Sequence, residues 1–480
     1  MSEQRERERL LAELDERIAR EPDASELLLM RAALLYLLGR DADAEEAYLD
    51  VVRRDPMHAG ALNDLATLVL RRGFAGRAAR LYARAVAAAP QDPSAYVHLG
   101  NLLLQDGNAA RSRRYYEAAL RIAPDHRGAH KGLAHALLDL GDEENARAHR
   151  EAGYRGDAVV HRPFRGEGAP LRVLLLASAS GGLFDADRFL DDRVFAVTQV
   201  VPEYLDGTAA LATQHVVVNA IADPDRARDA LDGAAKIARA LGLPVVNAPE
   251  RVAATGRLDV ARRMAQVEGT VVPRIREYPK AVLREGGGTA ATADGWSFPF
   301  LVRAPGHHTG RHFVMVGDAA DLCGALDALP GDRVLVIAHH DVRGADGFVR
   351  KYRAIAVGCR LFPLHLAIAR EWKVHWFSSL TPHEERFRRE EAAFLADMEA
   401  ALGARACAAL ERIAAELALD YAGIDFSLDG EGNVVLFEAN AAMRIPRPDA
   451  NPALAYRRSA TEAIVRAVQR LIVDRAFGVR

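Results

Sequence analysis

Cysteine is scarce in this 480-residue chain. Cys323, Cys359 and Cys407 are widely spaced and odd in number, so they predict neither a disulfide framework nor a zinc site. A reducing cytoplasm fits this pattern, and we expect a cytoplasmic protein. The chain also lacks an apolar run of 18 residues and an apolar segment near its charged N-terminus. These absences argue against a membrane span and a secretion signal.

The chain also has no large excess of positive or negative charge. The 63 basic residues nearly balance the 66 acidic ones, which gives a net charge of -3 and argues against a general nucleic-acid-binding protein. Only five of the basic residues are lysines, so we expect arginine at positions where lysine is usual. Half of the residues are hydrophobic. Together with the length, this composition predicts two or three globular domains.

The first third of the chain repeats with a period of 34 residues. Prolines follow this period at Pro22, Pro56, Pro90 and Pro124, and glycines follow it at Gly39, Gly73, Gly107 and Gly141. The same step separates Tyr48, Tyr82 and Tyr116, and it separates the small residues Ala32, Ala66, Gly100 and Ala134. The pattern resembles the tetratricopeptide repeat, a helical hairpin that stacks into a solenoid.

The spacing of apolar residues supports the resemblance independently. Between each proline and the next glycine, apolar residues lie three and four positions apart, which is typical of one face of an amphipathic helix. The glycine ends that helix, and a second helix runs to the next proline. We therefore expect an all-α repeat domain over residues 1–152, with a charged N-terminal cap and four repeats.

The first helix of each pair lines a concave groove in this family, and the groove commonly holds a peptide or a partner's tail. The resemblance places five residues on that face: Tyr36, Asn63, Asn101, Lys131 and His135. We expect the groove to recruit a peptide or protein substrate. Pure scaffolding or self-association into a homo-oligomer is the alternative interpretation.

The pattern changes after residues 153–170, which mix Gly, Pro and charge without a period and are typical of a linker. Short valine-rich runs alternate with a helical stretch over residues 171–250. This alternation predicts an α/β domain with a buried, largely parallel sheet. The Ser178–Gly182 loop after the first run lacks the GxGxxG spacing, so an ordinary turn explains it as well as a nucleotide loop does.

Residues 421–440, YAGIDFSLDGEGNVVLFEAN, predict a β-hairpin with its turn at Asp429–Gly432. If Leu428 pairs with Asn433, Asp425 lies opposite Leu436 and diagonally from Glu438. Asn440 then lies on the same face as Glu438, because side chains two apart on a strand point the same way. Two carboxylates and an amide on one face suit Mg²⁺. A surface hairpin with incidental acids is the alternative.

Here the chain resembles the ATP-grasp ligases, in which an acidic residue and an E-x-N motif bind the Mg²⁺ ions of ATP. The resemblance implies that Asp425, Glu438 and Asn440 are the metal ligands. It covers residues 171 to about 475 and implies a Rossmann-like pre-ATP-grasp domain over residues 171–250 and an α+β ATP-grasp catalytic domain over residues 251–480.

The resemblance also implies a nucleotide site. Arg257 and Arg303 stand where the family usually has ATP-binding lysines, and Gly310 lies in the Gly-rich loop that covers the phosphates. His339 falls in the hinge that holds adenine, and Asp341 would contact the ribose. In the same loop as Gly310, His307 and His308 are expected to be phosphate or solvent contacts, or less readily metal ligands.

Three further cations are expected to act in catalysis. The resemblance implies that Arg353 faces the phosphates and that Lys373 contacts phosphate, although an ordinary salt bridge would explain Lys373 almost as well. Arg444, four residues beyond Asn440, would orient an acceptor carboxylate as a bidentate pair. A surface arginine is the alternative interpretation.

The implied function is ATP-dependent carboxylate–amine ligation. A substrate carboxylate attacks the γ-phosphate, and the acyl phosphate is captured by a small amino acid or amine, with ATP and Mg²⁺ required and no protein nucleophile. The repeats would recruit a peptide or protein substrate. A non-catalytic nucleotide-binding scaffold that mediates protein–protein interaction is the alternative.

Overall fold

The computed structural model describes residues 3–182, 184, 186–205, 207, 211, 213–285, 294–306, 310, 312–446 and 451–478, with the side chains of Glu3 and Phe377 excepted. The chain forms two compact units. Unit 1 comprises Met1–Ser180 and Leu190–Val217, and unit 2 comprises Gly181–Phe189 and Val218–Arg480. No helix of the described residues combines the length and apolar character that crossing a membrane requires.

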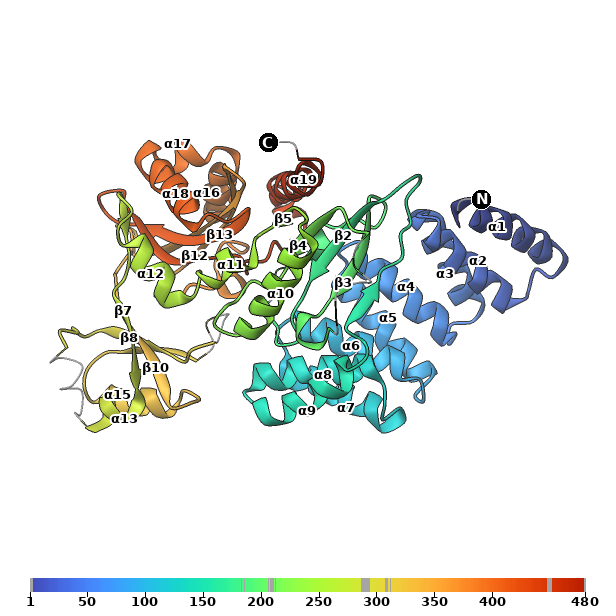
Figure 1. The fold of residues 1–480 in the computed structure, drawn as a ribbon, viewed down its shortest axis with the longest axis horizontal. Coiled ribbons are helices and arrows are strands. Elements are labelled where there is room, and N and C mark those ends of the chain that lie inside the picture. Colours follow the sequence, from blue (N-terminus) through green and yellow to red (C-terminus); the bar gives the residue numbers. More distant parts are fainter. Residues whose placement is uncertain are drawn as a thin grey trace. The chain divides into compact units, whose positions relative to one another are not determined.

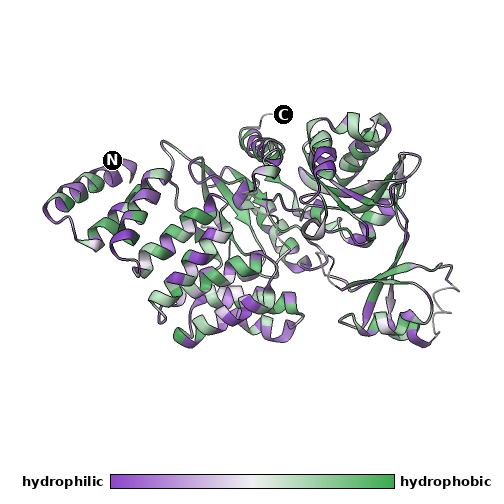
Figure 2. Cartoon of the chain, turned by 180° about the vertical axis from the view of Figure 1, so that it is seen from behind, coloured by the Kyte–Doolittle hydropathy of each residue, from purple (hydrophilic) through white to green (hydrophobic). Residues whose placement is uncertain are grey.

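The described residues of unit 1 begin with nine helices, which confirm the predicted all-α array. Figure 1 shows these helices as the first part of the chain. Helix α1 (Glu3–Arg20) precedes four helical hairpins. The hairpins are α2 (Ser25–Leu37) with α3 (Asp41–Arg54), α4 (Ala59–Arg71) with α5 (Ala75–Ala88), α6 (Pro93–Gln105) with α7 (Ala109–Ile122), and α8 (Arg127–Leu140) with α9 (Glu143–Tyr154). Hydropathy colouring shows hydrophilic and hydrophobic residues interspersed along these helices, as expected for amphipathic elements (Figure 2).

The glycines and tyrosines of the 34-residue period have defined structural roles. Gly39, Gly73, Gly107 and Gly141 adopt positive φ angles directly after or one residue beyond the first helix of each hairpin, a conformation that glycine adopts without steric cost. Tyr116 is fully buried, and a Cβ on Gly100 or Gly132 would lie 2.8 or 2.2 Å from its ring. The small residues therefore let neighbouring helices close over the tyrosine.

Three strands follow the helices in unit 1. They are β1 (Val159–His161), β2 (Leu171–Leu176) and β3 (Phe195–Val200). Strand β3 pairs antiparallel with β1 and parallel with β2, so the parallel pairing expected for the valine-rich runs is present between β2 and β3. Strand β2 is buried at every position except Arg172, as expected for a continuous apolar run.

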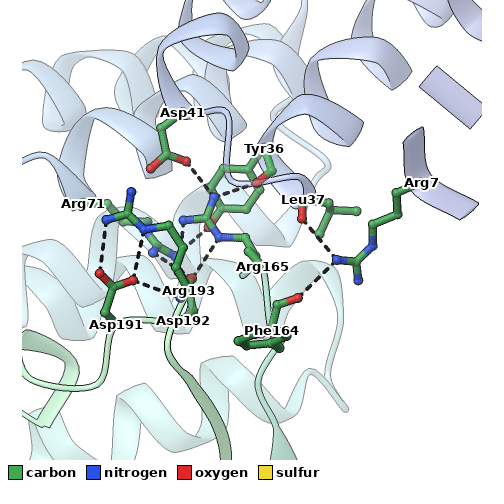
Figure 3. Close-up of polar contacts among 10 residues, drawn as sticks. All are labelled: Arg7, Tyr36, Leu37, Asp41, Arg71, Phe164, Arg165, Asp191, Asp192 and Arg193. Atoms are coloured by element: carbon green, nitrogen blue, oxygen red, sulfur yellow. Dashed lines mark hydrogen bonds and ion pairs between the residues drawn. The ribbon is translucent and has the colours of Figure 1, made fainter. Parts of the chain in front are cut away.

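The segment expected as a linker contains strand β1 and a buried arginine that binds the first repeat (Figure 3). The side chain of Arg165 is 1% exposed. Its Nη1 donates to Tyr36 O and Asp41 Oδ1, both at 2.6 Å, and its Nε donates to Asp192 Oδ2 at 2.9 Å. Its guanidinium lies 4.1 Å from the centre of the Tyr36 ring. Residues 153–170 are therefore anchored to the repeats.

A close backbone approach makes this anchor possible. A Cβ on Gly39 would lie 3.0 Å from Arg165 O, and a Cβ on Gly166 would lie 2.0 Å from Arg193 O. Arg7 Nη1 donates to both Leu37 O and Phe164 O at 3.1 Å, which joins helix α1 to the same segment. The repeats and the strands of unit 1 consequently share one hydrogen-bonded network.

Replacing Arg165 by methionine should destabilise unit 1 by about 3–5 kcal/mol, because Asp41 and Asp192 would lose a buried cationic partner. Arg155→Met is the matched control, since the Arg155 side chain is 78% exposed and its ion pair with Glu151 should contribute less than about 1 kcal/mol. Urea denaturation of the full chain measures both changes. Equal midpoints for the two variants would contradict the anchoring role.

Unit 2 contains two further sheets. Strand β4 (Val216–Asn219) spans the boundary of the units, and helix α10 (Arg228–Leu241), strand β5 (Val245–Val246), helix α11 (Pro249–Ala253) and helix α12 (Arg257–Met264) follow it. The first sheet has the antiparallel order β7 (Ile275–Pro279), β10 (Arg333–Ala338), β8 (Phe300–Arg303) and β9 (Phe313–Val316). Helices α13 (Lys280–Glu285) and α15 (Asp321–Asp327) accompany it.

The second sheet has the order β12 (Arg360–Ala369), β11 (Val349–Val357), β13 (Tyr421–Leu428), β14 (Val434–Asn440) and β6 (Thr270–Val271). Its helices are α16 (Glu385–Ala396), α17 (Met398–Leu402), α18 (Ala404–Leu417) and α19 (Arg457–Ala476). Aromatic residues fill its core: Tyr352 stacks on Phe426 at 5.4 Å and meets Phe394 edge-on at 5.1 Å. The repeat array is thus followed by a mixed α/β region, as the sequence predicted.

Buried Asn247, just after β5, binds the start of strand β13. Its backbone N donates to Asp420 Oδ2 at 2.8 Å, its Nδ2 donates to Tyr421 O at 2.9 Å, and its Oδ1 accepts from Tyr421 N at 2.8 Å. Because a buried amide must satisfy its polar atoms, these bonds fix the start of β13. The strand that carries Asp425 is therefore positioned from its first residue.

Candidate functional site

The turn of the β13–β14 hairpin is longer than the sequence predicted. Asp429 Oδ1 accepts from Glu431 N at 2.9 Å and from Asn433 N at 2.8 Å, and Gly432 adopts a positive φ. Leu428 therefore pairs with Val434, and the predicted pairing of Leu428 with Asn433 is wrong. The Asp429 side chain replaces backbone bonds that a tighter turn would make.

A second irregularity moves the two acidic residues closer together. Phe426 pairs with Leu436, but the register then shifts so that Asp425 lies directly opposite Glu438. The prediction that Asp425 lies opposite Leu436 and diagonally from Glu438 is therefore wrong. The bulge leaves Phe437 without a partner of its own in the ladder. Asn440 Nδ2 donates to Glu438 Oε1 at 2.9 Å, which confirms that these two side chains share a face.

Four titratable residues form a row across the second sheet. Arg353 on β11 pairs with Asp425 on one side and with His365 on the other, and Asp425 pairs with Glu438. Directly paired residues point to the same face of a sheet. The row therefore runs His365, Arg353, Asp425, Glu438 over four adjacent strands.

Asp425 is the most buried acid of this row, with a side chain 1% exposed. Arg353 binds it through two bonds, Nε to Oδ1 at 2.5 Å and Nη2 to Oδ2 at 2.8 Å, and Lys351 Nζ lies 2.6 Å from Oδ2. Burial alone would raise the pKa of Asp425, but the charges of Arg353 and Lys351 hold this pKa far below its usual range. Asp425 is therefore ionised at neutral pH despite its burial.

Glu438 is bound from a different element. Arg257, the first residue of α12, donates from Nη2 to Glu438 Oε1 at 2.7 Å. Arg303, the last residue of β8, is buried, and burial followed by the charge of nearby Arg257 lowers its pKa to about 10. The carboxylates of Glu438, Asp223 and Asp225 act on the pKa of Arg303 in the opposite direction. The structure thus brings Arg257, Arg303 and Glu438 close to one another.

Lys373 lies near the same group. Its Nζ donates to Phe313 O at 3.1 Å, and burial followed by the charge of Arg303 lowers its pKa. Gly310 adopts a positive φ, and a Cβ there would lie 3.0 Å from Lys373 Cε. Gly310 and Lys373 are therefore neighbours, whereas His307 and His308 lie outside the described residues.

Three predicted site residues stand apart from the row. Asp341 is exposed and forms an ion pair with Arg343 at 2.6 Å, and the hydrogen bonds from Arg343 lower its pKa. His339 follows strand β10, and burial lowers its pKa. Arg444 is exposed, and its side chain forms no hydrogen bond or ion pair with another of the described residues. Their assigned roles stay predictions.

Two residues of the site were missed by the sequence reasoning. Lys351 is one of only five lysines and stands two positions before Arg353, so strand periodicity places it on the same face. His365 is 2% exposed, and burial followed by the charge of Arg353 holds its pKa well below its usual value. It therefore stays neutral beside Arg353. The periodicity signalled Lys351, but nothing in the local sequence signalled His365.

The residues present fit Mg²⁺ and a polyphosphate in their chemistry. Asp425, Glu438 and Asn440 offer the oxygen ligands that Mg²⁺ prefers, on two paired strands. Among the described residues, three cations contact the carboxylates of Asp425 and Glu438: Arg257, Lys351 and Arg353. Their positive charge suits phosphate groups. No cluster of three or more His, Cys, Asp or Glu side chains suited to a metal occurs in the described part of the chain.

Four of the five predicted groove residues of the repeats have side-chain partners within unit 1. Lys131 Nζ lies 2.6 Å from Asp157 Oδ2, and Tyr116 donates to Asn101 Oδ1 at 2.7 Å. His135 Nε2 lies 3.3 Å from the Tyr154 hydroxyl, and Tyr36 stacks under Arg165. Asn63 Oδ1 is buried without a hydrogen-bond partner among the described residues. The carboxylate that Lys131 contacts is thus supplied by Asp157 of the same chain.

Comparison with known families identifies the helical array. The tetratricopeptide repeat model matches residues 7–59, 39–93, 63–126 and 97–158. Residues 7–158 are tetratricopeptide repeats. Comparison with curated proteins returns no match.

Several solved structures of repeat proteins are similar to about a third of the chain. MamA from Desulfovibrio magneticus RS-1 is 24% identical over 30% of this chain and 81% of its own, with a TM-score of 0.27. A thermophilic tetratricopeptide repeat protein from Thermus thermophilus is 21% identical over 30% and 79%, with a TM-score of 0.27. YrrB, described as having an unusual peptide-binding site, is 16% identical over 29% and 72%, with a TM-score of 0.27.

Asp425→Asn should destabilise unit 2 by about 3–5 kcal/mol at pH 7, because it leaves Arg353 and Lys351 without their buried counter-charge. The folded-state pKa of Asp425 is depressed, so its stabilisation is complete above the unfolded pKa of about 3.9 and is lost as the pH falls. The difference from wild type should therefore shrink by about 1.4 kcal/mol per pH unit below about pH 4.

Denaturant unfolding at about pH 7 and about pH 3 measures this effect. Asp327→Asn is the control, because the Asp327 side chain is 70% exposed. A difference between Asp425→Asn and wild type that is the same at both pH values would show that the ionised state of Asp425 does not stabilise the fold.

Proposed function

We propose that residues 171–480 form an ATP-dependent carboxylate–amine ligase of the ATP-grasp type, with a Rossmann-like leading domain over residues 171–250 and a catalytic domain over residues 251–480. The observation that supports the proposal most is the pairing of Asp425 with Glu438 at the end of the E-x-N hairpin, with Arg257, Arg303 and Arg353 gathered around them. Oxygen ligands beside a cluster of cations match a site for a metal-bound polyphosphate.

Each residue has a role in this proposal. Asp425, Glu438 and Asn440 would hold Mg²⁺. Arg257, Arg303, Arg353 and Lys373 would neutralise the phosphates, and ATP would supply the phosphoryl group that activates a substrate carboxylate.

The remaining predicted residues would bind other parts of ATP and the acceptor substrate. His339 and Asp341 would contact adenine and ribose, and Gly310 would cover the phosphates. Arg444, which is exposed, would orient an acceptor carboxylate. The amine of a small amino acid would then capture the acyl phosphate, with formation of an amide bond and release of ADP and phosphate.

Glu438→Gln should reduce ADP production by about 100-fold or more, because it removes a charge that holds the metal and contributes several kcal/mol to phosphoryl transfer. Glutamine keeps an oxygen for Arg257 and Asn440, so we expect the fold to persist. The control is Glu431→Gln, which makes the same change in the exposed turn of the same hairpin. ADP release with pooled carboxylates and amines measures both variants.

The result of this assay separates the ligase from the scaffold. ADP production by Glu438→Gln at the wild-type rate would contradict the metal role. A thermal shift of the wild type by ATP and Mg²⁺ without any turnover would favour a nucleotide-binding scaffold, because a ligand stabilises the state that binds it whether or not it reacts.

We also propose that the tetratricopeptide repeats recruit a peptide or protein substrate. The repeats offer an extended surface of stacked helices. Because Lys131, Asn101 and Tyr36 have partners within unit 1, a bound chain would contact other side chains of the array or displace the segment at residues 153–170. Contacts remote from the reacting atoms lower KM without changing kcat.

A peptide that carries the reacting amino acid at one end should therefore have a KM about tenfold lower than the free amino acid, with a similar kcat. Steady-state ADP production by the full chain with both acceptors gives the two constants. Equal KM values for a series of peptides of increasing length would contradict recruitment and favour scaffolding.

A further inference from the structure

Two cationic residues of strand β11, Arg353 and Lys351, contact Asp425, and their contacts differ. Arg353 binds both carboxylate oxygens, whereas Lys351 contacts only Oδ2. Both side chains are about one-fifth exposed, at 21% and 22%, while Asp425 is 1% exposed. One partner is thus bidentate and the other makes a single contact.

The strand register explains the difference. Arg353 lies directly opposite Asp425, so its planar guanidinium meets the carboxylate in the register of the sheet. Lys351 lies two residues earlier on the same face and reaches Asp425 diagonally through its flexible four-carbon stem. Lys351 is consequently the partner that can leave without a change of register.

The balance of charges around the two carboxylates indicates when Lys351 would leave Asp425. Arg257, Lys351 and Arg353 together contact Asp425 and Glu438. The three cations exceed the two carboxylates by one positive charge, so a divalent cation that approaches without a counter-ion is repelled, and the repulsion is strengthened where the dielectric constant is low. A polyphosphate brings negative charge that compensates the same cations.

We propose that Lys351 is a positioning residue that holds Asp425 in the absence of nucleotide and exchanges to the phosphates when a metal–polyphosphate complex binds. The inference rests on the proposed function. It explains why a lysine stands at this position in a chain that has only five lysines: a compact ammonium on a flexible stem breaks a single contact more readily than a guanidinium breaks two.

The test measures binding of Mn²⁺ alone, without nucleotide, by electron paramagnetic resonance on the full chain. Lys351→Met removes the charge and keeps most of the stem, so it should tighten Mn²⁺ binding by about tenfold relative to wild type. Lys236→Met is the matched control, because Lys236 is exposed on α10 and makes no ion pair recorded with a described residue. It should leave the Mn²⁺ affinity unchanged.

A second titration uses Mn²⁺ with a non-hydrolysable ATP analogue. If wild type binds that complex while Lys351→Met binds Mn²⁺ alone no more tightly than wild type does, the exchange role is wrong and the proposed function stands. If neither protein binds Mn²⁺ or the complex, the proposed function fails together with the inference.

Two further outcomes are decisive. Equal tightening in Lys236→Met would assign the effect to net charge and overturn the role of Lys351. The melting temperature of each variant shows whether it is folded, and Lys351→Gln, which also lacks the charge, replaces Lys351→Met if the latter unfolds. The same tightening is expected for Lys351→Gln.

Discussion

A single desolvated carboxylate constrains the second sheet. Asp425 is buried at a position where an unpaired charge would cost several kcal/mol, and its ionised state persists because Arg353 and Lys351 neutralise it. This pairing requires β11 and β13 to keep their register, since Arg353 reaches both oxygens only from the position directly opposite. The bonds of Asn247 to Tyr421 fix the same strand at its first residue. The positions of Glu438 and Asn440 depend on this alignment, because β14 takes its register from β13.

Unit 1 also contains a buried charge that is neutralised by its partners. Arg165 is as buried as Asp425 and is satisfied by Asp41, Asp192 and the carbonyl of Tyr36. Such a buried cation adds little net stability relative to apolar packing, but the loss of either partner is costly. Its effect is to specify how residues 153–170 lie on the first repeat. The array and the adjoining strands are therefore one folding unit, and removal of residues 1–152 would leave Arg165 without Asp41.

The sequence predicted those features that arise from periodicity. The 34-residue step gives the repeats because every hairpin must bury the same face, and the glycines of that step follow the first helix of each hairpin, as expected. Strand periodicity likewise placed Glu438 and Asn440 on one face. The roles given to these residues stay predictions.

The register of the hairpin was missed because it depends on local bonds of one side chain. Asp429 lengthens the turn through bonds to Glu431 and Asn433, and a bulge at Phe437 adds a second shift. Apolar alternation carries no signal for either feature. Arg165 was missed for a different reason: two of its partners lie 124 and 129 residues away, so nothing in the Gly- and Pro-rich segment around it indicates burial.

The scarcity of lysine makes the remaining lysines informative. Arginine is the better choice where a guanidinium makes several bonds, as Arg353 does with Asp425 and Arg165 does with four acceptor atoms. Lysine suits a position where one charge must approach and withdraw on a flexible stem. Two of the five lysines, Lys351 and Lys373, lie among the charged residues gathered in unit 2. The number of contacts thus accounts for the arginines at positions 165 and 353, whereas Lys351 contacts Asp425 through one oxygen and Lys373 donates to one carbonyl.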